Sequence, residues 1–264
     1  MIIVAAVLAA GCGGASEPAA SPAQQPSSGL SRILKDGAIN ICSTGDYRPF
    51  TYRDPQGQWS GLDIEMARDL ARRLHVKINL VPTTWASLMT DLGAKCELAM
   101  GGISITLGRA QQALFSSPYL RDGKAAIVRC ADQAKYKNLT DIDRPGVRVI
   151  TPPGGTNAEY DETHLHGAQV IVYPDNNTIF EQLTTNAAHV MVTDISEIRW
   201  ETKQNSQLCG VSVDHTFTFQ QKAYLVPGGD FVTQQWINQW LNIAQNDGTY
   251  ASLSQKYLGQ VVGP

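Results

Sequence analysis

The chain has 264 residues, of which 43% are hydrophobic and 17% are charged, and its formal net charge is −3. This composition is typical of a soluble globular protein and excludes a disordered chain or a mostly membrane-embedded one. No run of Lys and Arg exceeds two residues, so we expect no nucleic-acid partner and look for a small-molecule ligand.

The N-terminal segment is typical of an exported protein. Its first eleven residues, MIIVAAVLAAG, are apolar and stop at Cys12, which is too short for a membrane span and fits the hydrophobic part of a signal peptide within residues 1–12. LAAGC resembles the lipobox of bacterial lipoproteins. The resemblance implies a periplasmic or cell-surface protein whose membrane contact is a lipid anchor at Cys12.

Residues 13–30 are mostly Gly, Ser, Pro and Ala. Such a segment cannot bury enough apolar surface to offset its chain entropy, so we predict a flexible tether.

After the tether, short β-branched runs alternate with stretches of helical periodicity. Predicted strands lie at residues 39–44, 76–82, 97–102, 147–151, 169–174 and 189–193. Predicted helices lie at 63–74, 158–165, 177–185 and in the segment that carries Glu197. One face of the first helix is apolar, with Ile64, Ala67, Leu70, Ala71 and Leu74. Strands that alternate with helices predict parallel βαβ units.

The pattern restarts after residue 130, which indicates two lobes. RDGKAAIV at 121–128 and QQKAYLVP at 220–227 are the predicted crossings between them, and the helical segment 236–258 covers the first lobe. We therefore predict lobe 1 at 31–123 and 222–264 and lobe 2 at 124–221. Each lobe is expected to be a mostly parallel α/β sheet flanked by helices, with a double-stranded hinge and a ligand cleft at the carboxyl ends of the strands.

Four cysteines follow Cys12: Cys42, Cys96, Cys130 and Cys209. An even number in an exported chain is compatible with disulfides. We prefer the pair Cys130–Cys209, because both lie at the edges of the same predicted lobe. The sequence leaves the full connectivity open, and Cys42 and Cys96 could equally be buried thiols.

Two strand-to-helix turns are candidate anion sites. GGISITLGR at 101–109 leaves a strand and enters a helix whose expected cap is Thr106; a helix start offers unpaired N–H groups to a carboxylate. Arg109 lies in the first turn, where a cation is electrostatically disfavoured, so we interpret it as a clamp on a ligand carboxylate rather than a surface arginine. PPGGTN at 152–157 has the same arrangement in the second lobe, with Thr156 as the expected cap, although a plain turn would also explain it.

Aromatic residues follow the first two predicted strands. GDYRPFTY supplies Tyr47 and Phe50, and PTTW supplies Trp85. Such residues more often fill a core than contact a ligand. Their position at strand ends predicts that they form walls of the cleft.

The segment TDISEIR at 193–199 allows three interpretations. Asp194 and Glu197 fit a capping box, in which Asp194 caps the helix and Glu197 reaches back to its N–H. Asp194 could instead accept a ligand ammonium. Glu197 could be a proton donor if desolvation in a closed cleft outweighs the helix dipole, which favours the ionised form. The capping and acid interpretations therefore predict opposite protonation states for Glu197.

We expect no metal and no organic cofactor. His164 and His166 are separated by one residue, without a Cys or carboxylate ligand in register, and are more typical of a surface than of a metal site. The sequence has no nucleophile elbow, CxxC or GxGxxG motif.

Taken together, these motifs resemble a known family. From about Leu30 to Leu258, GLDIEMARDLARRL, GGISITLGR, FSSPYL and the TD at 193–194 are similar to the type II periplasmic solute-binding proteins for polar amino acids. The resemblance implies that Gly102, Ser104 and Arg109 bind a ligand carboxylate and that Asp194 binds its amino group. It also implies a possible permease partner of the ABC-transporter type.

A narrower resemblance connects both lobes. STGDYRPFTYR, PTTW, SPYLRDGK, PGGTN, PDNNTIFEQL and TDISE are similar to the cyclohexadienyl dehydratases, exported enzymes of this fold that convert prephenate to phenylpyruvate and arogenate to phenylalanine. The resemblance implies that Glu197 is the general acid of a carbon–oxygen lyase, with Tyr47, Trp85, Ser104 and Arg109 lining the site.

Other residues of the matched segments extend this set. We also expect Lys124, Gly155 and Thr156 to contact the substrate. The sequence departs from these enzymes at Pro152, where they carry Asn. A non-catalytic amino-acid-binding protein of an ABC transporter is the alternative.

Overall fold

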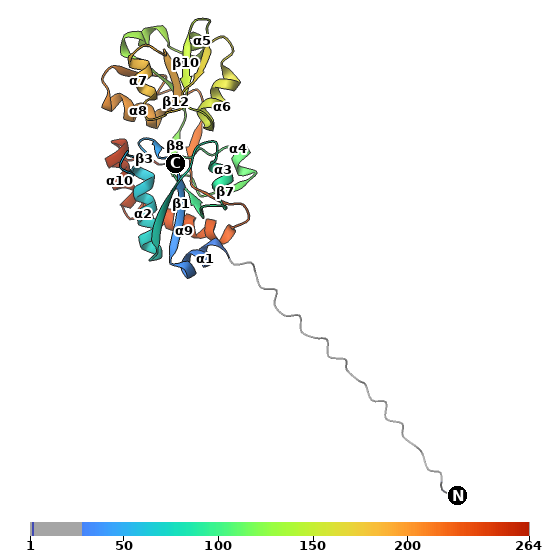
Figure 1. Ribbon diagram of the computed structural model, residues 1–264. Coiled ribbons are helices and arrows are strands. Elements are labelled where there is room, and N and C mark those ends of the chain that lie inside the picture. Colours follow the sequence, from blue (N-terminus) through green and yellow to red (C-terminus); the bar gives the residue numbers. More distant parts are fainter. Residues whose placement is uncertain (1, 3–27, 264) are drawn as a thin grey trace.

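The computed structural model describes Ile2 and residues 28–263 and shows two lobes joined by a narrow connection (Figure 1). The predicted signal peptide, the lipid anchor at Cys12 and nearly all of the predicted tether lie outside the described residues. The first helix already begins at Gly29, so the tether ends slightly earlier than predicted. In the described part of the chain, every helix is too short or too polar to cross a membrane.

Lobe 1 is formed by both ends of the described chain. Its elements before the first crossing are α1 (Gly29–Asp36), β1 (Ala38–Ser43), β2 (Asp46–Tyr47), β3 (Thr51–Arg53), β4 (Trp59–Ser60), α2 (Leu62–Leu74), β5 (Lys77–Pro82), α3 (Leu88–Asp91), β6 (Leu98–Ala99), α4 (Leu107–Ala110) and β7 (Ala113–Phe115). After the second crossing it adds β15 (Leu225–Pro227), α9 (Phe231–Asn246) and α10 (Thr249–Leu258).

Lobe 2 is formed by the chain between the two crossings. Its elements are β9 (Lys124–Arg129), the 3-10 helix η1 (Cys130–Lys135), α5 (Leu139–Ile142), β10 (Arg148–Thr151), α6 (Gly155–His164), β11 (Gln169–Val172), α7 (Ile179–Thr184), β12 (Val190–Asp194), α8 (Ile195–Gln204) and β13 (Leu208–Val211).

Two strands form the hinge between the lobes. β8 (Leu120–Asp122) leaves lobe 1 and β14 (Gln220–Lys222) returns to it, and the two pair antiparallel with Gln220 opposite Asp122. Figure 1 shows β8 at the junction of the two lobes. The predicted double-stranded hinge is therefore confirmed.

Each sheet is mostly parallel, as predicted, with one strand of the five running in the opposite direction. Lobe 1 has the order β5-β1-β6-β15-β7 and lobe 2 has the order β11-β10-β12-β9-β13. In each sheet the first three strands are parallel, and the last two pairings are antiparallel. The reason is the double crossing. Strands β9 and β15 directly follow the hinge, so they enter their lobe from the cleft and run opposite to the parallel strands, which end there.

The predicted helix at 63–74 is α2, and its predicted apolar face is buried. The exposed fractions of Ile64, Ala67 and Leu70 are 0%, and Leu74, at 8%, is the most exposed residue of that face. Each sheet has an apolar layer on both faces. In lobe 2, Ala125 and Ile127 of β9 pack toward α7 and α8, whereas Ala126 and Val128 pack toward the opposite cluster that contains Tyr160 of α6. The apolar layers of both lobes hold the strand ends in fixed positions at the cleft.

Two disulfides connect the four described cysteines. Cys130 and Cys209 form a disulfide, as we preferred from the sequence, and Cys42 and Cys96 form the other one rather than remaining buried thiols. Cys42 and Cys96 are 0% and 2% exposed. Cys130 and Cys209 are half-buried at the surface of lobe 2.

We expect a mild reductant to open Cys130–Cys209 before Cys42–Cys96, because a thiolate can reach only the accessible pair without unfolding the lobe. Mass spectrometry of native protein alkylated after timed reduction measures this order. Replacing Cys130 and Cys209 with Ala should lower the free energy of unfolding by roughly 2–5 kcal/mol. Equal reduction rates for both disulfides would contradict the expectation.

Candidate active site

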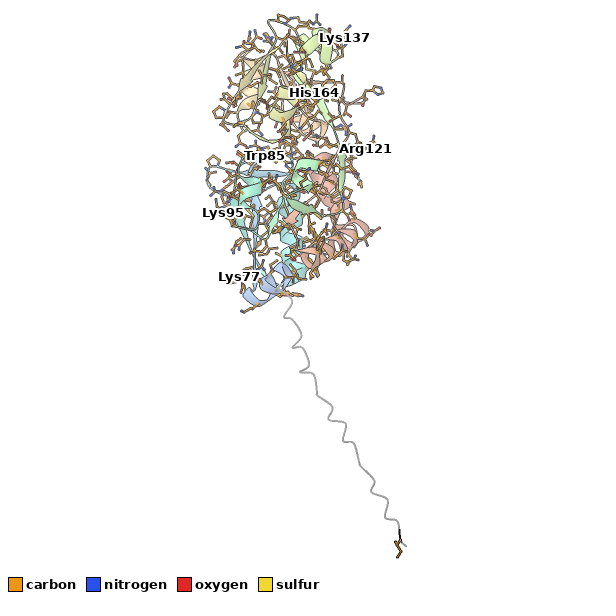
Figure 2. The ribbon with its side chains drawn as sticks, turned by 90° about the vertical axis from the view of Figure 1, so that its right-hand side faces the viewer. Lys77, Trp85, Lys95, Arg121, Lys137 and His164 are labelled. Atoms are coloured by element: carbon orange, nitrogen blue, oxygen red, sulfur yellow. A yellow bond between two sulfur atoms is a disulfide. The ribbon has the colours of Figure 1, made fainter. Side chains whose placement is uncertain are left out.

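A cavity lies between the lobes and contains about 320 Å³ of space, part of it open to solvent. We call it the cleft cavity. From lobe 1 it is lined by Tyr47, Trp85, Gly102, Ser104 and Arg109. From lobe 2 it is lined by Pro152, Gly154, Gly155, Thr156, Asn157, Asn176 and Asp194. Figure 2 shows Trp85 at the level where the two lobes meet.

Eight residues predicted from the sequence line this cavity: Tyr47, Trp85, Gly102, Ser104, Arg109, Gly155, Thr156 and Asp194. They come together because most of them follow the carboxyl ends of strands that reach the same boundary. Three other predicted residues lie behind the wall. Phe50 is 0% exposed and its ring is stacked 5.5 Å from that of Tyr47, so it supports the wall without reaching a ligand. Lys124 and Glu197 are also absent from the lining.

The turn after β6 brings the backbone close to the cavity. Gly102 has φ of +68°, and a Cβ at this position would lie 2.5 Å from the ring of Phe50 and 2.7 Å from that of Tyr47. Any other residue would push these rings apart, so the position requires glycine. The N–H of Gly102 donates to Asp63 Oδ2 at 2.6 Å. The N–H is therefore already occupied, and Gly102 contributes shape rather than a donor.

Arg109 lies in the short helix α4, whose expected cap is confirmed: Thr106 Oγ1 accepts from the N–H of Arg109 at 3.2 Å. Its guanidinium donates to the carbonyl oxygen of Ser104 at 3.0 Å and makes no ion pair among the described residues. The side chain is 8% exposed and burial lowers its pKa, but an arginine remains charged. A buried guanidinium without a carboxylate partner is suited to an anionic ligand.

Asp194 lines the cavity but does not cap α8 with its side chain. Its carboxylate pairs with Lys222 through Oδ2 and with Lys124 through Oδ1, the latter at 2.8 Å, and Tyr47 donates to Oδ2. Burial alone would raise the pKa of Asp194, but Lys124 and Lys222 hold it well below its usual range. Both lysines are 0% exposed, so one carboxylate shares two buried cations.

Glu197 does not form the predicted capping box either. It is 1% exposed, and its Oε2 accepts a hydrogen bond from Thr193. Burial raises the pKa of Glu197 well above its usual value, and Glu201 and Asp194 raise it further, although Thr193 and Lys124 oppose the shift. Burial therefore favours the protonated form of Glu197, which is the direction that the acid interpretation predicts.

A chain of hydrogen bonds leads from Glu197 toward the cavity. Asn157, which lines the cavity, donates through Nδ2 to Thr193 Oγ1 at 2.9 Å, and Thr193 donates to Glu197. Lys124 donates to Asn157 Oδ1 and, at 3.0 Å, to Thr156 Oγ1. Lys124 thus orients wall residues instead of touching the ligand.

Sequence reasoning missed Asn157, Asn176, Thr193 and Lys222. Asn157 and Asn176 line the cavity, and Asn176 Nδ2 also donates across the cleft to the carbonyl oxygen of Asp46 at 2.8 Å. Lys222, in the hinge strand β14, donates a hydrogen bond through Nζ to Ser104 Oγ at 2.9 Å. Two of these residues could have been found from the sequence. Asn157 lies in the first turn after PGG, and Lys222 lies within a predicted crossing, and both positions were expected to face the cleft.

Pro152 lines the cavity and supplies carbon surface without a side-chain donor. The described residues contain no group of three or more His, Cys, Asp or Glu that could hold a metal ion. His164 uses Nδ1 in a 2.9 Å hydrogen bond with the carbonyl oxygen of Tyr160 in its own helix. The polar groups at the cavity are hydrogen-bond donors, hydrogen-bond acceptors and cations.

Comparisons with known proteins agree with this fold. Residues 39–260 match the family model of the bacterial extracellular solute-binding proteins, family 3. A cyclohexadienyl dehydratase of Pseudomonas aeruginosa is 42% identical over 241 residues, which are 91% of this chain and 90% of the relative. An L-cystine-binding protein of Escherichia coli is 25% identical over 87% of this chain and 86% of the relative.

Two solved structures are similar. An ancestral amino acid-binding protein, described as a precursor of cyclohexadienyl dehydratase, superposes with a TM-score of 0.81 at 31% identity, covering 87% of this chain and 99% of the other. An ancestral cyclohexadienyl dehydratase superposes with a TM-score of 0.56 at 43% identity, covering 89% and 98%. The chain belongs to the bacterial extracellular solute-binding proteins of family 3.

Proposed function

We propose that the protein is a cyclohexadienyl dehydratase that converts prephenate to phenylpyruvate in the cleft between its lobes. The observation that carries this proposal is the placement of Glu197, a buried carboxyl group whose pKa is raised by burial and which is linked to a ligand cavity through Thr193 and Asn157. A raised pKa has no use in capping a helix, where the ionised form is favoured. It is what a proton donor requires. The identity of 42% to a dehydratase over most of both chains supports the same reaction.

The reaction asks little of the protein. Prephenate loses its ring hydroxyl, which takes a proton from Glu197 and leaves as water. At the same time the bond to the ring carboxylate breaks, carbon dioxide departs, and the electron pair of that bond completes the aromatic ring. For the proton transfer the carboxyl group of Glu197 has to turn from behind Thr193 and Asn157 into the cavity. Glu197 is left ionised and recovers a proton from solvent when the lobes open. General acid catalysis typically contributes about 10² to 10⁴ in rate.

The wall residues then have separate roles. Arg109 holds the side-chain carboxylate of the substrate, and Tyr47 and Trp85, whose rings are perpendicular with centroids 5.4 Å apart, bound the substrate ring. Asn157 and Thr193 hold the carboxyl group of Glu197 in place. No metal or organic cofactor takes part in this scheme.

The charge balance favours prephenate over arogenate. Lys124 and Lys222 share Asp194, and Asp122 lies 3.8 Å from Lys222. Arg109 has no acidic partner among the described residues, so three cations near the cavity face two carboxylates. Prephenate carries two carboxylates, whereas arogenate carries an ammonium group in addition. An ammonium placed near two buried lysines would be repelled.

The decisive assay is incubation of the purified protein with prephenate while phenylpyruvate is followed by its absorbance. We expect turnover, and a higher kcat/KM for prephenate than for arogenate. Absence of turnover with both substrates, together with tight binding of a free amino acid, would replace this proposal by the second candidate. That candidate is a non-catalytic amino-acid-binding protein that serves an ABC permease, and the similarity of fold to an ancestral amino acid-binding protein supports it.

We further propose that the protein works outside the cytoplasm. The family is described as extracellular, and two disulfides persist best in an oxidising compartment. A lipid anchor at Cys12 is part of the same proposal. Labelling of cells with a radioactive fatty acid, compared between the parent and Cys12→Ser, tests the anchor.

Replacing Arg109 with Gln should raise KM for prephenate roughly 10- to 100-fold, because a hydrogen-bonded charge pair is worth about 1.5–3 kcal/mol. The rate constant kcat should change much less, since the proton donor remains. Steady-state kinetics measure both constants. Arg72→Gln, which removes an exposed arginine of helix α2 in the same lobe that does not line the cleft cavity, is the matched control. A fall in kcat with unchanged KM would contradict the role of Arg109 as a clamp.

A further inference from the structure

A second pocket lies between the lobes and shares no lining residue with the cleft cavity. It contains about 440 Å³ of space, part of it open to solvent. Three elements form its walls: the hinge strand β8, helix α8 of lobe 2, and the end of α10 with the segment that follows it in lobe 1. Figure 2 shows Trp85, at the cleft cavity, on the left side of the molecule and Arg121, at the wall of this pocket, on the right side, both near the level where the lobes meet.

The pocket is cationic. Arg121 from β8 and Arg199 and Lys203 from α8 line it, and none of its lining residues is Asp or Glu. None of the three cations has an ion-pair partner among the described residues. The guanidinium of Arg121 lies over the ring of Phe219, 5.3 Å from its centroid. All three side chains are exposed, so water screens them from one another, but an anion bound in the pocket would face three cations and no carboxylate among the lining residues.

The remaining walls are largely apolar and aromatic. Trp200 of α8 and Tyr257 of α10 line the pocket together with Leu120, Ile195, Leu258 and Val262. The four aliphatic residues are distributed over all three walls, so an occupant would have apolar surface on several sides. An inorganic anion would leave this surface unused.

The wall from the C-terminal segment is held in place. Ser254 donates to the carbonyl oxygen of Gln260 at 2.7 Å and accepts from the N–H of Val262 at 3.1 Å. The N–H of Arg121 donates to the carbonyl oxygen of Gly263 at 2.9 Å. Three hydrogen bonds therefore fix the segment against α10 and the hinge, and the pocket has a defined shape.

We propose that this pocket is a second ligand site and that its ligand is a small aromatic carboxylate. The carboxylate lies among Arg121, Arg199 and Lys203, and the ring lies between Trp200 and Tyr257. An aromatic amine has no acidic partner here, and a zwitterionic amino acid brings an ammonium group toward three cations. The site is distinct from the cleft cavity, and its existence does not depend on the reaction there.

The test is isothermal titration of 3-phenylpropionate into the Arg109→Gln protein, in which the clamp of the cleft cavity is missing. We expect saturable binding. Adding Arg199→Gln and Lys203→Gln should raise the remaining Kd roughly tenfold or more, because two charge-assisted contacts are lost. Adding Lys77→Gln and Lys137→Gln instead, two exposed cations far from the pocket in Figure 2, should leave Kd unchanged.

Ligand competition tests the chemical class in the same Arg109→Gln protein. Phenylethylamine and phenylalanine should bind far more weakly than 3-phenylpropionate, and sulfate at the same ionic strength as a chloride control should not displace it. The proposal is overturned if the Arg199→Gln and Lys203→Gln changes leave Kd unaltered or if no binding remains in the Arg109→Gln protein. Equal binding of phenylalanine, or displacement by sulfate, would overturn the assignment of an aromatic carboxylate.

Discussion

Replacing Glu197 with Gln is expected to lower kcat for prephenate by roughly 10²-fold or more, with KM nearly unchanged. Gln keeps the size of the side chain and its carbonyl oxygen still accepts the hydrogen bond from Thr193. What it lacks is the proton that the leaving hydroxyl needs. Steady-state kinetics with phenylpyruvate absorbance measure the loss.

The same substitution should stabilise the protein at neutral pH. Burial raises the pKa of Glu197 in the folded protein above its value in the unfolded chain. The contribution of the protonated group to the free energy of unfolding is therefore fully present below about pH 4.5 and is lost as the pH rises toward the folded pKa. The loss amounts to about 1.4 kcal/mol per pH unit within that window. Gln does not titrate. The melting temperature of Glu197→Gln should therefore exceed that of the parent at pH 7 and match it below about pH 4.5.

Glu181→Gln is the control, since Glu181 is exposed on helix α7 of the same lobe. It should change neither kcat nor the pH profile of stability. If Glu197 were an ionised capping residue, its replacement would leave turnover intact and would lower the melting temperature at pH 7. That result would contradict the assignment of Glu197 as the acid.

Replacing Asp194 with Asn is expected to lower the free energy of unfolding by about 3–5 kcal/mol, the cost of breaking a buried ion pair. Lys124 and Lys222 are both 0% exposed, and they would lose the carboxylate that they share. For a chain of this size the melting temperature should fall by roughly 6–20 °C. Because the pKa of Asp194 is depressed, its contribution is present above about pH 4 and is lost at lower pH, where parent and variant should converge.

A double-mutant cycle separates the ion pair from other effects of the change. Replacing Lys124 with Met in the Asp194→Asn protein should recover part of the lost stability, because one uncompensated buried charge is removed. In the parent, Lys124→Met should be destabilising. Asp214→Asn, at an exposed position of lobe 2, is the control and should stay within about 0.5 kcal/mol. Additive effects of the Asp194 and Lys124 changes would show that the two groups are not coupled.

The features that the sequence determined are local. The apolar period of α2, the alternation of strands and helices, and the cap of α4 by Thr106 depend on residues within a few positions of one another. The two crossings could be read because they interrupt that alternation, and they implied a cleft to which the loops after the strands contribute. That reasoning found eight of the residues that line the cavity.

The features that only the tertiary structure decided are those that depend on burial and on distant charges. Asp194 and Glu197 have the spacing of a capping box, but Lys222, which is 28 residues away, and Lys124 from another strand occupy Asp194. Phe50 lies behind Tyr47 instead of beside the ligand, because the packing of α2 and the turn at Gly102 place it there. A spacing in the sequence states which groups are neighbours along the chain. It does not state how much water surrounds them, and for Glu197 it is the removal of water that raises the pKa.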